Sequence, residues 1–296
     1  MAQVGQLDFQ GWVQRRKGFD EAPDGGERGY AYVADRQTRM TFEKVRPVQL
    51  AAEAAVRAFK AVGKNQLLGN AVKVGPRQFP RVYGLVSSCA QTLGIPVPTI
   101  YIVNNPVLNA GTYGTNDDAF IVIHSGLVDH YSDDELRAVI GHECGHIHNN
   151  HVVYLTTLYY LTAGLSAFLS WIVRPALVAL NAWSRRAEIT SDRAALLCAT
   201  SPEVATRSLT KLALGSQKLY EQLDLEAFLE QYEESQQGLG RLNELFATHP
   251  WLPKRVLALR VFEQSRFYRR CAGLGDDGLS MDEVDEKVQD IVKVVG

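Results

Sequence analysis

The stretch that decides the fold runs from residue 132 to residue 146 and reads Ser-Asp-Asp-Glu-Leu-Arg-Ala-Val-Ile-Gly-His-Glu-Cys-Gly-His. It opens with a capping box, because Ser132 is followed three residues later by Glu135 and then by an apolar-periodic run. We therefore expect a helix to begin immediately after Ser132. His142 and His146 are four residues apart, so both imidazoles lie on one face of that helix and can reach a single metal ion.

Glu143 follows the first histidine of this H-E-x-x-H pattern. Zinc accepts imidazole nitrogen, and catalytic zinc sites combine three protein ligands with a water molecule. A carboxylate beside a histidine ligand can reach such a water and accept its proton, so we interpret Glu143 as a general base. The pattern therefore predicts one zinc ion (Zn2+) per chain, with a ligand position left open to water.

A third metal ligand can be found by elimination, because no Asp or Glu occurs between residues 147 and 187. The first carboxylate after the motif is Glu188, and Asp192 follows four residues later on the same helical face. We expect Glu188 to bind the metal and Asp192 to accept a hydrogen bond from a ligand imidazole. The alternative interpretation of Glu188 is a solvated surface residue beside Arg185 and Arg186.

Other zinc arrangements fit the sequence less well. The metzincin pattern needs a histidine at position 152, which is Val152, and the aminopeptidase spacing needs a glutamate at position 165, which is Leu165. His148 and His151 fall on other faces of the helix, so we interpret them as ordinary polar residues rather than metal ligands.

Composition limits the possible partners and the compartment. The 296 residues are 46% hydrophobic, which is enough for one substantial core, and the formal net charge of −2 gives no reason to expect a nucleic-acid partner. Four cysteines without a C-x-x-C pair favour buried, reduced thiols over a disulfide framework. Residues 1–20 lack the apolar run of a secretory signal, so we expect the catalytic part to lie in the cytoplasm.

Residues 152–183 depart from this pattern because they are strongly apolar. Residues 152–173 carry no charged side chain and could span a bilayer, but a single span would separate Glu188 from His142. We therefore expect an apolar helical hairpin that turns back. It is either buried in the fold or in an oligomer, or it contacts a membrane, which would make the protein peripheral to the membrane or inserted in it.

Three runs of β-branched and aromatic residues, at 99–103, 107–113 and 119–124, are separated by turn residues and predict a small antiparallel sheet. Most of the remaining segments have helical composition, so the expected fold class is α+β and mainly α. Further helices are expected at residues 45–62 and 81–93, after Ser201 and after Ser280.

Several separated segments resemble the HtpX-like and CAAX-prenyl-protease-like metallopeptidases of peptidase family M48, over about residues 80–260. The resemblance implies a zincin-like fold with the gluzincin ligand arrangement, acting on protein or peptide substrates. Besides the zinc motif, the segments are Asn109-Ala110, Ser125-Gly126-Leu127, Asp134-Glu135-Leu136, Glu188-x-x-x-Asp192 and Thr248-His249-Pro250 with Arg255-Val256.

The same resemblance implies roles for residues outside the motif. Asn109 and Ala110 would lie on an edge strand that holds an extended peptide by β-augmentation. His249 would donate a hydrogen bond to the oxyanion of the tetrahedral intermediate, and Arg255 would anchor the loop of His249, through Asp192.

On this basis the chain divides into three parts. Residues 1–44 are expected to be an irregular N-terminal lead-in, and residues 45–265 a zincin-like peptidase domain that includes the apolar hairpin. Residues 266–296 are expected to form an acidic, helical C-terminal tail.

Two functions remain open at this point. The first is a zinc-dependent metalloendopeptidase that uses a metal-activated water with Glu143 as general base. The second is a catalytically silent zinc-binding scaffold that associates with a membrane or a partner through residues 152–183. Glu143 favours the enzyme, because a structural zinc site does not need a base.

Overall fold

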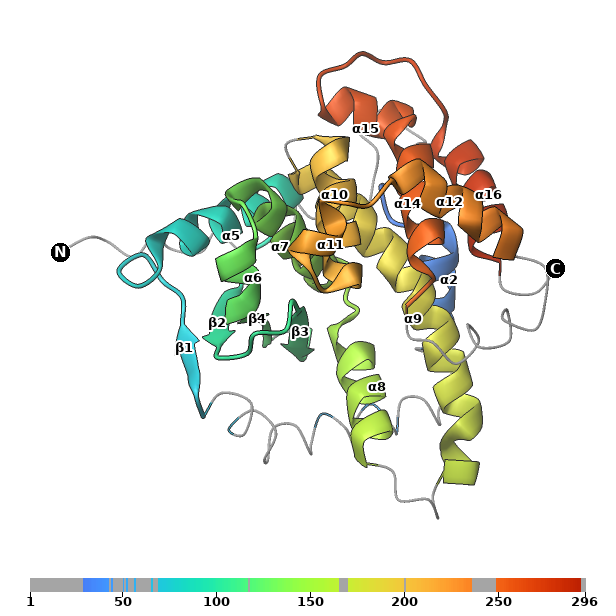
Figure 1. Ribbon diagram of the computed structural model, residues 1–296. Helices are drawn as coiled ribbons and strands as arrows, with labels where there is room; N and C mark the ends of the chain where they lie inside the picture. The colour runs from blue at the N-terminus through green and yellow to red at the C-terminus, as the bar shows by residue number, and fades with distance from the viewer. Residues whose placement is uncertain are drawn as a thin grey trace.

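The computed structural model describes residues 29–42, 44, 50, 52, 56, 65, 69–116, 118–164, 170–199, 201–235 and 249–293. Within these residues the protein is a mainly helical body that carries one small sheet, as expected for the α+β class (Figure 1). The strands are β1 (Ala71–Lys73), β2 (Thr99–Val103), β3 (Ala110–Gly114) and β4 (Ala119–His124). The helices are α2 (Val33–Phe42), α5 (Pro80–Leu93), α6 (Ser125–His130), α7 (Asp133–His148), α8 (Val152–Gly164), α9 (Ser170–Cys198), α10 (Pro202–Leu214), α11 (Gln217–Tyr220), α12 (Leu225–Ser235), α14 (Leu252–Glu263), α15 (Arg266–Cys271) and α16 (Met281–Val292).

The sheet is mixed, with the strand order β1-β2-β4-β3. The pairing of β3 with β4 is antiparallel as expected, whereas β2 and β4 run parallel. Strand β1, which the sequence analysis did not predict, pairs antiparallel with β2. The reason is that the chain leaves β2, crosses to the far side of the β4 position to form β3, and returns through a tight turn. This path makes β3 an edge strand, and β3 contacts the helix that carries the histidine motif.

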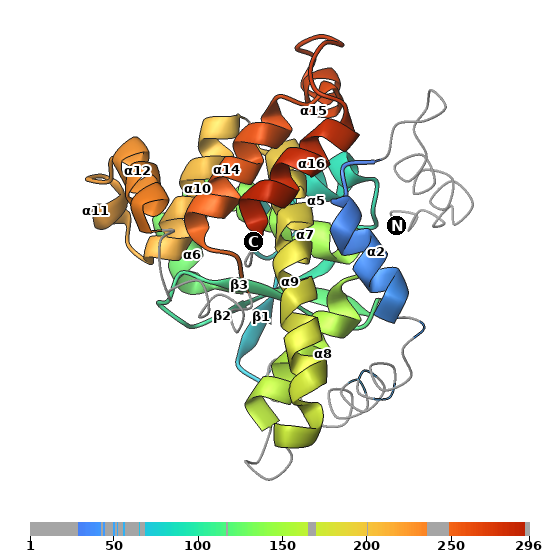
Figure 2. The same cartoon turned by 90° about the vertical axis from the view of Figure 1, so that its right-hand side faces the viewer.

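Helices α7 and α9 form the centre of the molecule (Figure 2). The capping box at the start of α7 is present, because the Glu135 amide donates to Ser132 Oγ at 3.3 Å and the Ser132 amide donates to Glu135 Oε2 at 2.9 Å. A Cβ atom added at Gly141 would lie 2.6 Å from the Cβ of Cys198, and one added at Gly145 would lie 2.7 Å from the Cβ of Ala194. Both glycines therefore allow α9 to approach α7 closely.

The apolar segment forms two helices that run side by side, α8 and the first half of α9 (Figure 1). The expected return of the chain is therefore observed. Among the described residues, no helix has both the length and the apolar character needed to cross a bilayer. The two helices and α2 enclose a separate small core of buried aromatic and aliphatic side chains: Phe42, Tyr154, Leu158, Leu180 and Trp183.

The N-terminal segment differs from the irregular lead-in that the sequence led us to expect. Residues 33–42 form α2, which packs against α9. A ten-residue helix is too short to be stable alone, so its helical state depends on this packing, which the sequence does not reveal. Residues 1–28 and most of the helix expected at 45–62 lie outside the described residues.

The C-terminal segment packs on the main body. Ser280 opens α16 with the expected capping box, and Met281, Val284 and Val288 are buried in the same core as α14. All four cysteines are free; Cys271 is exposed and the other three are buried. The division of the chain at residues 44 and 265 stays a prediction.

The close contact between α7 and α9 gives a direct test. We expect Gly141→Ala to lower the free energy of unfolding by about 1–3 kcal/mol, because the added methyl group overlaps the Cys198 side chain. Gly84→Ala is the matched control, since Gly84 lies within α5 with no atom within 4 Å of an added Cβ. That control should raise the free energy of unfolding by up to about 1 kcal/mol. Urea unfolding measures both, and equal effects would contradict the packing described here.

Candidate metal centre and active site

Three side-chain atoms converge from α7 and α9. His142 Nε2 lies 3.2 Å from His146 Nε2, and Glu188 places one carboxylate oxygen 3.4 Å from the first nitrogen and the other 3.5 Å from the second. A tetrahedral zinc ion with bonds of about 2.0–2.1 Å separates its ligands by about 3.3–3.4 Å. The three residues therefore form a group that could hold a metal ion, with nitrogen and oxygen atoms at separations close to those of zinc ligands.

His142 is oriented by Asp192. The Nδ1 atom of His142 lies 3.0 Å from Asp192 Oδ1, so this ring nitrogen donates to the carboxylate and Nε2 faces the site. Burial lowers the pKa of His142, but Glu188 and Asp192 outweigh it and raise the pKa to about 10. The position that His142 Nε2 faces is thus strongly favourable for a cation.

His146 is oriented by a residue that the sequence analysis set aside. Its Nδ1 lies 3.0 Å from Nδ1 of His151, which is fully buried and in turn contacts Asp35. The helix ends at His148, and Asn150 has a left-handed φ of 57°, which turns His151 back under the helix. On a continuous helix His151 would lie on another face from His146, but the chain leaves the helix before it. His151 is therefore a buried contact of His146 and not the ordinary polar helix residue expected, while the group that could hold a metal ion does not include it.

The two carboxylates of α9 share one guanidinium. Arg255 donates from Nε to Asp192 Oδ2 at 2.8 Å and from Nη2 to Asp192 Oδ1 at 2.6 Å, and its Nη2 lies 3.1 Å from Glu188 Oε2. Burial raises the pKa of Glu188, but His249 and Arg255 hold it well below its usual range. Glu188 Oε2 is buried and makes no hydrogen bond of good geometry; its neighbours are the Arg255 guanidinium at 3.1 Å and His142 Nε2 at 3.4 Å.

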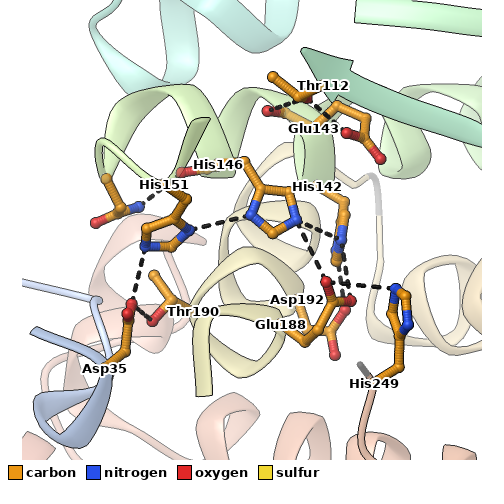
Figure 3. A network of polar contacts seen from close by, with 12 residues as sticks. Asp35, Thr112, His142, Glu143, His146, His151, Glu188, Thr190, Asp192 and His249 are labelled. Atoms are coloured by element: carbon orange, nitrogen blue, oxygen red, sulfur yellow. Dashed lines mark hydrogen bonds and ion pairs between the residues drawn. The ribbon is translucent and has the colours of Figure 1, made fainter. Parts of the chain in front are cut away.

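Glu143 lies beside the metal ligands and is held from the sheet. Its Oε2 accepts a hydrogen bond of 2.6 Å from the Thr112 hydroxyl on β3. This hydrogen bond orients the carboxylate at the boundary between helix and strand (Figure 3). The sequence does not reveal the hydrogen bond from Thr112 to Glu143, because a threonine in a strand carries no signal for a contact with a distant carboxylate.

His249 lies at the mouth of the site. Its Nε2 is 3.6 Å from Glu188 Oε1, while its side chain is 59% exposed. The sequence separates His249 from the motif by more than 100 residues, yet the structure brings it to the same carboxylate as both ligand histidines (Figure 3).

A cleft of about 290 Å3 opens over these residues. Asn109 and Ala110 line one side of it, together with His142, Glu143 and His249. The Asn109 carbonyl accepts from the amide of His124 on β4 at 3.0 Å. Since backbone groups alternate in direction along an antiparallel strand, the N–H and C=O of Ala110 point to the open edge of the sheet.

The open edge of β3 is short. At its far end, Thr156 of α8 accepts from the Gly114 amide at 3.2 Å and donates to the Gly114 carbonyl at 3.1 Å. The backbone groups of Ala110 and Thr112 are therefore the ones left for another extended segment.

The amino-acid sequence matches the model of peptidase family M48 over residues 76–263. The chain belongs to peptidase family M48. The family is one of metal-dependent peptidases, in agreement with the resemblance noted from the sequence and with the metal-ligand geometry.

Individual relatives agree with this assignment. The chain is 40% identical over 168 residues to the plastoglobule-localized metallopeptidase 48 of Arabidopsis thaliana, covering 55% of this chain and 49% of that protein. It is 28% identical over 235 residues to a protease HtpX homolog of Moorella thermoacetica, covering 68% of this chain and 78% of the relative. An HtpX homolog of Tropheryma whipplei is 25% identical over 262 residues, 78% of this chain and 89% of the relative. The chain therefore spans about half the length of the Arabidopsis protein and more of the bacterial ones.

The shared guanidinium predicts a large effect of removing Arg255. We expect Arg255→Met to lower the free energy of unfolding of the zinc-free protein by about 3–5 kcal/mol, because two buried carboxylates lose their cation. The double variant Arg255→Met with Asp192→Asn should recover part of this loss. Chemical unfolding in the presence of a chelator measures both, and a loss below about 1 kcal/mol for the single variant would contradict the network.

Proposed function

We propose that this protein is a zinc-dependent endopeptidase that hydrolyses peptide bonds in protein or peptide substrates. The observation that carries the proposal is the convergence of His142, His146 and Glu188 at the ligand separations of tetrahedral zinc. The position of Glu143 beside that point, in a cleft bordered by an open strand edge, supports a catalytic role rather than a structural one.

Bound by these three residues, zinc would supply the Lewis acidity that lowers the pKa of a water towards about 7 and polarises the scissile carbonyl. Glu143 accepts the proton of the attacking water and later delivers it to the leaving amine. The hydrogen bond from Thr112 occupies Oε2 of Glu143, so Oε1 is the oxygen available for proton transfer.

His249 is proposed to donate a hydrogen bond to the oxyanion. Its exposed ring lies at the mouth of the cleft and can turn towards a substrate carbonyl. One donor of this kind is typically worth about 2.7–4 kcal/mol in the transition state. Arg255 would act by holding Asp192, and through it the ring of His142.

The substrate is proposed to bind as an extended strand along β3. The outward backbone groups of Ala110 and Thr112 would pair with the peptide, and Asn109 would border the strand at the start of β3. This arrangement places the peptide between the edge strand and the histidine helix, over Glu143.

The second candidate, a catalytically silent zinc-binding scaffold, is favoured by one observation only. Tyr159 on α8 and Val178 on α9 are about half exposed on the apolar hairpin, at 49% and 46%. We propose that residues 152–183 contact a membrane surface or a second copy of the chain, with the catalytic part in the cytoplasm. Such contact is compatible with the peptidase and does not need a silent site.

The general-base assignment predicts that Glu143→Gln keeps zinc and loses hydrolysis. The amide is isosteric and can still accept from Thr112, but it cannot take a proton from water, so the rate should fall by at least about 100-fold. Cleavage of casein or a quenched peptide library measures the rate, and metal analysis measures the zinc content. Wild-type activity in this variant would remove Glu143 from the mechanism, and loss of wild-type activity on chelation is the accompanying control.

A further inference from the structure

Asp35 is a buried carboxylate behind the metal site. It comes from α2, outside the residues matched by the family model, and its exposed fraction is 2%. Its Oδ1 accepts from the Trp183 indole at 2.8 Å, and its Oδ2 accepts from the Thr190 hydroxyl at 2.7 Å and contacts His151 Nε2 at 3.0 Å. Trp183 and Thr190 each donate a hydrogen to this carboxylate, one to each oxygen, so both oxygens of Asp35 act as acceptors.

A chain of polar contacts leads from Asp35 to the metal ligand His146 (Figure 3). Because an ionised carboxylate cannot donate, His151 carries its proton on Nε2. In the tautomer with a single proton, on Nε2, His151 turns its Nδ1 lone pair to Nδ1 of His146, 3.0 Å away, and accepts a hydrogen bond from it. The proton of His146 is thereby fixed on Nδ1, and its Nε2 is bare towards the metal position.

We propose that Asp35 is a positioning residue for the zinc site, fixing through His151 the tautomer of His146 that presents a bare Nε2 to the metal. The inference rests on the proposed function, because it concerns the zinc ion of that same site. With this role for Asp35, each ligand histidine is oriented by an aspartate. Asp192 contacts His142 directly, and Asp35 acts on His146 through the imidazole of His151.

The charge state of Asp35 fits this role. Burial raises its pKa, but the polar contacts with His151, Thr190 and Trp183 outweigh burial and lower it, so the group is a carboxylate at neutral pH.

The contacts from Asp35 through His151 to His146 form a relay that sets which ring nitrogen carries each proton. An asparagine at position 35 would reverse these proton positions. Its single oxygen can face either Trp183 or the pair of His151 and Thr190, and its NH2 group must face the other side. With the oxygen towards Trp183, the NH2 group donates to His151 Nε2 and moves the ring proton to Nδ1. His146 Nδ1 must then accept, its proton moves to Nε2, and the metal position is blocked. With the oxygen towards His151, the indole N–H of Trp183 loses its acceptor.

The alternative is that Asp35 only docks the N-terminal segment onto the body. Asp285 of α16 provides the matched control, because it docks the same segment without touching the relay. It accepts from the Val33 amide at 3.1 Å and pairs with Arg193 at 2.8 Å, and Arg193 in turn donates to the Tyr30 carbonyl at 3.1 Å. Both are buried aspartates that hold residues 30–35 in place.

The test compares the zinc dissociation constants of the full chain, Asp35→Asn and Asp285→Asn, by competition with a chromophoric chelator. We expect Asp35→Asn to weaken zinc binding by about 10–100-fold and Asp285→Asn to change it by less than about threefold. Binding by Asp35→Asn within about threefold of the unmodified chain, or equal weakening in both variants, would overturn the positioning role. If the unmodified chain does not bind zinc at all, the proposed function fails and the inference fails with it.

A second measurement needs no variant and covers the case in which Asp35→Asn does not fold. Long-range 1H–15N spectra of the 15N-histidine-labelled, zinc-free chain report the tautomer of each ring. We expect His146 to carry its proton on Nδ1 and His151 on Nε2. The reverse tautomer at either ring would overturn the relay, whatever the peptidase assay shows.

Discussion

Glu188 and Asp192 place two buried carboxylates one helical turn apart on α9, facing the histidines of α7. Two such charges are costly to bury unless cations face them. Arg255 supplies one guanidinium, which takes both oxygens of Asp192 and approaches Glu188. The Glu188 oxygen that Arg255 approaches, Oε2, also lies 3.4 Å from His142 Nε2, and the other oxygen, Oε1, lies 3.5 Å from His146 Nε2. The surrounding structure holds this negative charge and two imidazoles around one point.

Several parts of the described fold hold the side chains around that point in place. Gly141 and Gly145 let α7 and α9 approach closely, which brings His142 and His146 within 3.5 Å of the Glu188 carboxylate. Strand β3 reaches α7 from the sheet and holds Glu143 through Thr112. Two segments outside the residues matched by the family also contact this region. Helix α2 contributes Asp35, which contacts His151 just beyond α7. Helix α16 contributes Asp285, which pairs with Arg193 next to Asp192 on α9.

Much of this site could be predicted from the sequence, because its signals are local or exclusive. The capping box placed the start of α7, and four-residue spacing placed both histidines on one face. The absence of acidic residues between 147 and 187 left Glu188 as the first available carboxylate. What could not be predicted depends on contacts between segments far apart in sequence. The parallel pairing of β2 with β4, the helix α2, the bond from Thr112 and the inward turn of His151 all arise in this way.

The central claim is that His142, His146 and Glu188 bind one zinc ion. X-ray diffraction from zinc-loaded crystals at the zinc absorption edge tests this claim most directly. We expect a single anomalous peak about 2.0–2.1 Å from Nε2 of His142, Nε2 of His146 and a carboxylate oxygen of Glu188, with a water in the fourth position. A peak elsewhere, Glu188 turned away from the metal, or a fourth position closed by a protein side chain would contradict the account.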